Sequence, residues 1–221
     1  MRFICRHWYN LGLIPGTFAA CILVLFWRDL DTLVKINLFS FIVVILHQFE
    51  EYGWPGGAPA MGNQMYCSGK MPAPMQKLLG RGNQPDRYPL NQFSAMVTNC
   101  LATYIFYLLP VFLPDVIWLG LAPVLFGFFQ FVMHGIGGNV MLKKLYNPGL
   151  AAVVFGHIPV GIWYIYHISI NGLASKTDWL CGVLYAIAFF VLVIGVLTYK
   201  VLADKNSPYP FDEKELARFR G

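Results

Sequence analysis

Charged residues are scarce in this sequence. Only 12% of the 221 residues are Asp, Glu, Lys or Arg, whereas a soluble domain carries about a quarter. Hydrophobic residues make up 57% of the chain, too many for a water-soluble surface. The scarcity of charge therefore excludes an ordinary soluble fold and indicates that the solvent is a lipid bilayer.

Cysteine and histidine patterns exclude several kinds of site. The five cysteines form no CxxC or other metal-type spacing, so neither a disulfide framework nor a cysteine metal site is supported. The five histidines are too few for the histidine-rich di-iron sites of membrane desaturases and hydroxylases. The zincin signature HExxH and the Glu-x-x-His pairs of two-iron bundles are also missing.

Apolar residues occur in runs of about twenty, the length of a transmembrane helix. The runs predict an all-α integral membrane protein, a single domain over residues 1–221. Its six helices are expected near 11–27, 33–52, 91–113, 118–141, 149–169 and 179–201. A long connection, 53–90, and a tail, 202–221, complete the chain. Gly and Pro occupy 13 of the 38 positions in 53–90, so we expect no regular helix through most of it.

The distribution of Lys and Arg predicts the orientation. Six spans place both termini on one side, and positively charged short loops remain cytoplasmic. Only Arg28, Lys35 and Lys176 fall on the opposite side. The side that carries both termini holds thirteen Lys and Arg residues: Arg2, Arg6, Lys70, Lys77, Arg81, Arg87, Lys143, Lys144, Lys200, Lys205, Lys214, Arg218 and Arg220. Both termini and the 53–90 connection are therefore expected in the cytoplasm, and the +5 net charge implies no nucleic acid. Short loops without a sorting motif favour a bacterial plasma membrane.

The first apolar run also fits a cleaved signal peptide, because Arg2 and Arg6 precede it and Ala19 and Ala20 offer a cleavage point. Apolar residues continue past that point to Trp27. The continuation favours a retained transmembrane helix.

The densest ionisable cluster inside a predicted span is His47-Gln48-Phe49-Glu50-Glu51. At about 100° per residue, His47 and Glu51 lie one turn apart on one helix face, with Glu50 beside them. The pattern His47-x-x-Glu50-Glu51 in a small multispan protein resembles the HXXEE family of membrane proteins, whose biochemical role is unassigned. The resemblance implies a site at this motif but supplies no reaction.

Other polar residues are expected at the same depth. At about 1.5 Å per residue, His47 lies roughly 8 to 9 Å and His134 roughly 10 Å from the cytoplasmic ends of their helices. Asn99 lies roughly 12 Å and His157 roughly 12 to 13 Å deep by the same count. Four helices therefore contribute polar side chains to one layer.

A divalent metal, zinc or iron, would explain this layer, because two adjacent glutamates cannot both stay ionised in a low dielectric without a cation. The candidate ligands are His47, Glu51, His134 and His157. Glu50 is the candidate general base, by analogy with the HxxEH metallopeptidases. Candidates for contacting the substrate or supporting the ligands are Asn99, Gln130 and Trp54, which could belong to a lid or anchor the connection at the interface.

These observations favour a single-metal intramembrane enzyme, hydrolytic as a first hypothesis, acting on a lipid or other apolar substrate. Three alternatives stay open: a metal-free acid–base isomerase or cyclase, a proton- or ion-coupled transporter, and an accessory subunit whose polar layer fixes helix packing. No internal repeat is evident, so a transporter would need a homodimer to supply its second half.

Two local features have structural interpretations. His157 could simply form a hydrogen bond to a neighbouring helix. Asn147-Pro148-Gly149 is predicted to cap and open the fifth helix.

Overall fold

The computed structural model describes residues 1–69, 73–80 and 82–217, and these residues contain helices and no strands. Four of the thirteen basic residues on the predicted cytoplasmic side, Lys70, Arg81, Arg218 and Arg220, lie outside this part of the chain. Within the described residues, six helical segments are long and apolar enough to cross a membrane. The prediction of an all-α, multi-pass membrane protein is confirmed.

The first two spans form an antiparallel pair. The first is α1 (Arg2–Phe26), and the second joins α2 (Thr32–Gln48) to the π-helical turn η1 (Phe49–Gly53). The first helix begins nine residues before the predicted boundary at 11. Arg2 and Arg6 are therefore part of the helix rather than of a flanking segment.

The other four spans combine α-helix with π-helix, as the second span does. The third contains α5 (Gln92–Leu101), η2 (Ala102–Tyr107) and α6 (Leu109–Phe112), and the fourth contains α7 (Ile117–Gln130), η3 (Phe131–Gly138) and α8 (Asn139–Leu142). The fifth contains α9 (Leu150–Ala152), η4 (Val153–His157) and α10 (Ile158–Ile170), and the sixth contains α11 (Lys176–Ala188) and η5 (Phe189–Val201).

The second span lies at the centre of the bundle. In the most apolar 18-residue stretch of this span, 56% of the residues are buried. The corresponding shares for the first and sixth spans are 22% and 11%. Its side chains join a core in which the Phe106 and Phe189 rings stack at 4.1 Å between centroids. The central position brings the end of the second span, with its polar motif, into contact with its neighbours.

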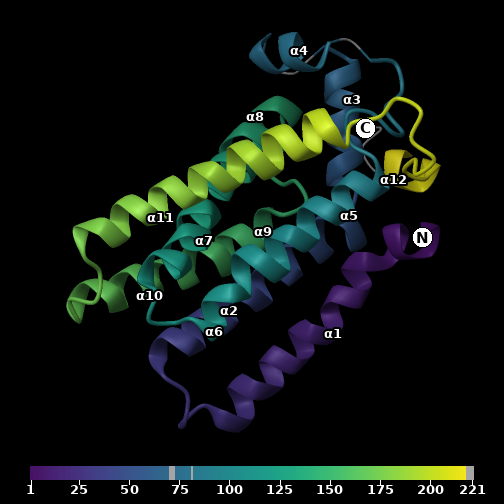
Figure 1. Cartoon of the computed structure of the whole chain (residues 1–221). Coiled ribbons are helices and arrows are strands. Elements are labelled where there is room, and N and C mark those ends of the chain that lie inside the picture. Colours follow the sequence, from purple (N-terminus) through teal and green to yellow (C-terminus); the bar gives the residue numbers. More distant parts are fainter. Residues whose placement is uncertain (70–72, 81, 218–221) are drawn as a thin grey trace.

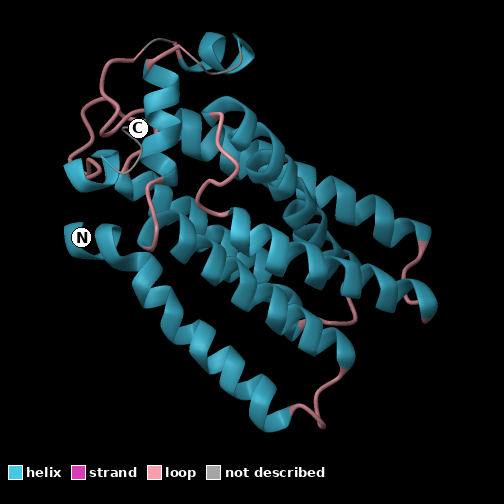
Figure 2. Ribbon diagram, turned by 180° about the vertical axis from the view of Figure 1, so that it is seen from behind, coloured by secondary structure: helices cyan, strands magenta, loops and turns pink. Residues whose placement is uncertain are grey.

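Both termini lie at the same end of the bundle (Figure 1). The short helices α3 (Ala58–Cys67), α4 (Ala73–Leu79) and α12 (Glu213–Ala217) gather at this end. The view from behind shows shorter loops at the opposite end (Figure 2).

The 53–90 connection is more regular than its composition suggested. Two helices, α3 and α4, lie within it, and buried polar contacts hold it in place. Asn63 is fully buried and donates to the carbonyl oxygens of Pro85 and Leu90 at 3.1 and 2.7 Å. Pro59 falls near the start of α3, where its missing N–H costs no helical hydrogen bond.

Candidate metal site

The polar layer is built around the end of the second span. His47 lies in the last turn of α2, and Glu51 follows in the π-helical turn η1. His134 lies in η3 and His157 ends η4, so π-helical turns accompany all three segments. Such turns are rare and often occur at functional sites, because the wider turn redirects side chains.

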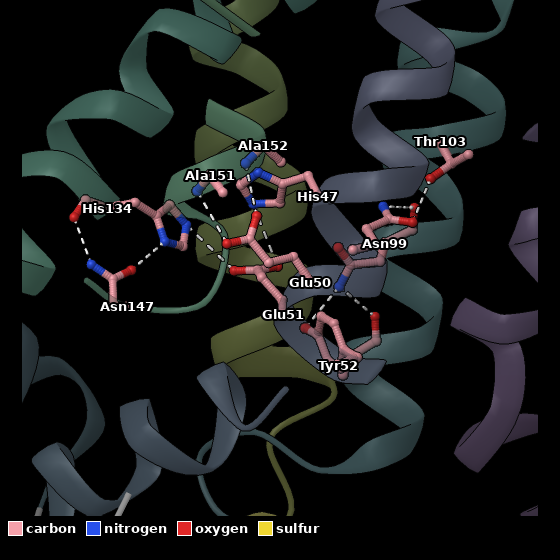
Figure 3. A network of polar contacts seen from close by, with 12 residues as sticks. His47, Glu50, Glu51, Tyr52, Asn99, Thr103, His134, Asn147, Ala151 and Ala152 are labelled. Carbon is pink, nitrogen blue, oxygen red and sulfur yellow. Dashed lines mark hydrogen bonds and ion pairs between the residues drawn. The ribbon is translucent and has the colours of Figure 1, made fainter. Parts of the chain in front are cut away.

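Three of the predicted ligands converge in space. The Glu51 carboxylate lies between two imidazoles, with Oε2 3.6 Å from His47 Nε2 and Oε1 3.4 Å from His134 Nε2 (Figure 3). One ligand atom from each of the three residues lies within 4.8 Å of the others. His47 is 3% exposed, and the side chains of Glu51 and His134 are 17% and 12% exposed. The second and fourth spans thus supply a buried His–Glu–His group that could hold a metal ion.

The fourth predicted ligand, His157, is close to this group but is not a member of it. Its ring centroid lies 5.3 Å from that of His47. The His47 and His134 centroids are 5.0 Å apart. His157 is 4% exposed, so three histidines from three helices share one buried space. Whether His157 binds a metal stays a prediction.

The two nitrogen atoms of the His47 ring are buried without a hydrogen-bond partner. A buried polar atom without a partner costs about 1 to 3 kcal/mol. The separations of 3.4 and 3.6 Å from Glu51 to the two histidines are too long for ordinary N–H···O hydrogen bonds. Two tetrahedral ligands at about 2.1 Å from one zinc ion are separated by about 3.4 Å. The orphaned nitrogen atoms and these separations therefore fit a shared divalent cation.

His134 is held in one tautomer by Asn147. The Asn147 amide nitrogen donates to the His134 carbonyl oxygen at 2.6 Å and to Asn139 Oδ1 at 2.7 Å. Its oxygen therefore faces His134 Nδ1 at 2.8 Å and accepts the proton of that nitrogen. Nε2, on the side of Glu51, is left with its lone pair. Metal-binding histidines characteristically donate their other N–H in this way.

Glu50 has a different set of partners from Glu51. Its Oε1 accepts from the Tyr146 hydroxyl at 2.7 Å and from the Ala151 N–H at 3.0 Å, and its Oε2 accepts from the Ala152 N–H at 2.7 Å (Figure 3). The carboxylate thus caps the start of the fifth span, where the helix dipole favours negative charge. Burial, followed by the hydrogen bond and negative charge of Glu50, raises the pKa of Tyr146 and keeps its hydroxyl a donor.

This arrangement corrects the predicted cap of the fifth span. Asn147-Pro148-Gly149 was expected to cap and open that helix. The helix begins at Leu150 instead, and its N-cap position is Gly149, which has no side chain with which to cap it. The Asn147 side chain contacts His134 instead. Glu50, which lies in the second span, accepts the N–H groups of Ala151 and Ala152 at the start of the fifth span. A tertiary contact has replaced the local one.

The three residues predicted to contact substrate or support the ligands occupy different places. The Asn99 side chain donates to the Tyr52 hydroxyl at 2.9 Å, and the Asn99 carbonyl oxygen accepts from Gln48 at 3.1 Å, so Asn99 contacts residues beside the predicted ligands. Trp54 is 76% exposed, so its ring does not cover the ligands. Gln130 is half-buried at the end of α7 and makes no hydrogen bond to the ligands among the described residues.

Sequence reasoning missed Gly149. It has a φ of 101°, and a Cβ placed on it would lie 2.7 Å from His134 Cε1 and 3.2 Å from Glu51 Cγ. Only glycine fits this backbone and this space. The Pro-Gly pair marked a turn, but nothing in the sequence showed that the turn packs on the ligands.

The fold and the site define a multi-pass membrane protein with a buried His–Glu–His group built on the motif His47-x-x-Glu50-Glu51. The sequence model described as "Protein of unknown function with HXXEE motif" matches residues 38–164. The chain belongs to this HXXEE family, as its motif had suggested, and the match includes all four predicted metal ligands. Comparisons with curated proteins and with solved structures found no match.

Proposed function

We propose that this protein is a single-metal intramembrane enzyme, and that His47, Glu51 and His134 hold a divalent cation. The observation that supports the proposal most is the convergence of these three side chains around the orphaned His47 nitrogen atoms. Two histidines and one glutamate form the ligand set of several catalytic zinc sites, which keep a further position open. A closed structural zinc site has four protein ligands instead.

The same set of two histidines and one carboxylate also serves non-haem iron oxygenases. We propose hydrolysis with zinc because hydrolysis requires only water besides the substrate, whereas oxygenation requires an oxidant and electrons. A bound zinc ion would polarise a carbonyl or phosphoryl oxygen and lower the pKa of a water molecule. Iron in the purified protein would move the proposal to oxidative chemistry.

The surrounding residues position the ligands. Asn147 holds the His134 tautomer, and Glu50 ties the second span to the start of the fifth. Because both Glu50 oxygens already accept hydrogen bonds, we propose a positioning role for Glu50 in place of the general base expected from the motif. His157, buried against the His47 ring, is our candidate for accepting and returning the proton.

The substrate class follows from the place of the site. The ligands lie in helices long and apolar enough to cross a membrane, with His47 about 9 Å, at 1.5 Å per residue, from the end of the second span. Glu51 and His134 lie about 3 and 6 Å from the ends of their spans by the same rise, so all three ligands belong to segments that the bilayer would surround. We therefore propose a lipid or other apolar substrate that enters laterally between helices.

Elemental analysis of the detergent-purified protein tests the proposal. Wild type should carry nearly one metal ion per chain, and the His47→Ala, Glu51→Ala double variant should lose it. His167→Ala is the matched control, because His167 lies near the other end of the fifth span and pairs with Asn171. Absence of metal from folded wild type that has been reloaded with zinc and with iron(II) would overturn the metalloenzyme and favour metal-free acid–base chemistry or transport.

A further inference from the structure

A cavity of about 330 Å³ lies at the end of the bundle that carries both termini. Its walls are Arg2, Arg6, Arg87, Gln92 and residues 207–210. Two chain segments far apart in sequence, the start of α1 and the end of the 53–90 connection, thus contribute guanidinium groups to one space, and no acidic residue is among the described residues that line it. The volume corresponds to about ten water molecules, enough for a phosphate group and part of its substituent.

The charges of the lining residues themselves are not balanced, because they include three arginines and no acidic residue. Arg6 pairs with Asp212 at 2.6 Å, and Arg87 pairs with Asp86 at 2.6 Å. A third carboxylate, Glu215, accepts from the lining amide of Gln92 at 3.5 Å, whereas Arg2 has no ion pair among the described residues. A guanidinium has five N–H donors, and one carboxylate cannot satisfy them all. The cavity therefore keeps both positive charge and free donors.

The position of Arg2 and Arg6 on α1 adds to this imbalance. Both lie in the first two turns, where the helix dipole disfavours positive side chains, and the first turn holds no acidic residue. Nor does a side chain cap this helix start. An anion in the cavity would offset the repulsion among these groups.

A largely aromatic cluster contains sequence neighbours both of the cavity residues and of the candidate ligand Glu51. Trp8, Tyr52, Ala95 and Phe211 pack together one helical turn or less from the cavity residues Arg6, Gln92 and Pro210, and the Trp8 and Tyr52 rings lie 4.9 Å apart. The cavity is thus at the edge of the apolar spans, at the level where lipid headgroups meet protein. Lipid phosphates at this level are attracted by basic side chains.

We propose that this cavity binds a phosphate group through Arg2, Arg6 and Arg87. Arginine forks fit phosphate oxygens in pairs and form strong charge-assisted hydrogen bonds. The phosphate group belongs to an anionic phospholipid of the surrounding leaflet or to free phosphate, which present the same oxygens. The site is distinct from the His–Glu–His group and holds whether or not a metal binds there.

Native mass spectrometry of the full-length purified protein tests the proposal, with phosphatidylglycerol, diacylglycerol and inorganic phosphate as probes. Wild type should retain phosphatidylglycerol but not diacylglycerol, which has the same chains without the phosphate. Arg2→Gln should weaken retention about tenfold, since it removes a charged hydrogen-bonding partner. Arg28→Gln, two residues beyond the other end of α1, should leave retention unchanged. Arginine-dependent binding of inorganic phosphate, without a preference for lipid, would support the cavity with a soluble ligand.

A second variant separates binding from folding. Asp212→Asn breaks the Arg6–Asp212 ion pair yet leaves all three arginines, so it should retain the lipid as tightly as wild type or more tightly. If this variant lost lipid as Arg6→Gln does, the arginines would serve only to fix the tail, and the proposal would be wrong. Equal retention of diacylglycerol, or retention that is insensitive to Arg2→Gln and Arg6→Gln, would also overturn it.

Discussion

Glu50 and Glu51 are neighbours in the sequence, yet their carboxylates serve different helices. Glu50 accepts the N–H groups of Ala151 and Ala152 at the start of the fifth span, whereas Glu51 lies between His47 and His134. The doubled glutamate of the motif therefore combines two tasks at one helix end. One carboxylate joins two helices, and the other faces the candidate metal.

Substitution of each glutamate by glutamine should separate these tasks. Glu51→Gln should lose the metal, because a neutral amide is a poor ligand beside two histidines. Glu50→Gln should keep the metal but lower the free energy of unfolding by about 1 to 3 kcal/mol, since its NH2 group cannot accept an N–H. Metal content and denaturation in detergent measure the two effects. Loss of metal from a folded Glu50→Gln protein would instead assign Glu50 to the metal.

The Asn147 amide should control metal affinity without binding metal. Asn147→Ala removes the acceptor for the His134 Nδ1 proton, so the ring can rotate and change tautomer. Loss of such a partner typically weakens metal binding about 10- to 100-fold. Competition with a chelator measures the affinity. Asn139→Ala removes the far partner of Asn147 and two hydrogen bonds to the Gly135 and Leu145 carbonyl oxygens, but it leaves the acceptor for the His134 proton in place. This variant should have a smaller effect, and equal effects would argue against the tautomer explanation.

The helices and the approximate depth of the polar residues could be predicted, because both depend on local sequence and on the thickness of the bilayer. Counting depth placed His47, His134 and His157 in one layer, and their rings are in fact neighbours. Depth does not specify rotation about the helix axis, however. Asn99, expected in the same layer, bonds to Tyr52 rather than to the ligand group.

The parts of the site that could not be predicted depend on tertiary contacts. Glu50 caps a helix about a hundred residues further along the chain, and no local pattern encodes such a contact. Asn147 precedes Pro-Gly and therefore looked like a local cap, but the buried His134 ring competed for its side chain. The π-helical turns that redirect Glu51 and His134 have no simple sequence signal.

Gly149 should be essential for the site. Gly149→Ala adds a Cβ 2.7 Å from His134 Cε1 at a φ of 101°, so the turn must move away from the ligands. Gly172→Ala is a matched control, because Gly172 also has a positive φ, 61°, but nothing lies within 4 Å of its added Cβ. Both variants should lose about 1 to 2 kcal/mol of stability from backbone strain, but only Gly149→Ala should lose metal. Equal metal content in the two variants would show that the contact with His134 is unimportant.

The orientation of the bundle can be tested at its two ends. The excess of Lys and Arg predicts that the termini face the cytoplasm, and both termini lie at one end of the structure (Figure 1). Lys205→Cys and Asp115→Cys place single thiols at exposed positions on opposite ends, in a variant whose native cysteines are replaced by serine. In intact cells an impermeant maleimide should label the thiol at 115 and spare that at 205, and both should react after lysis. Labelling only at 205 in intact cells would invert the orientation and place the arginine-lined cavity on the external side.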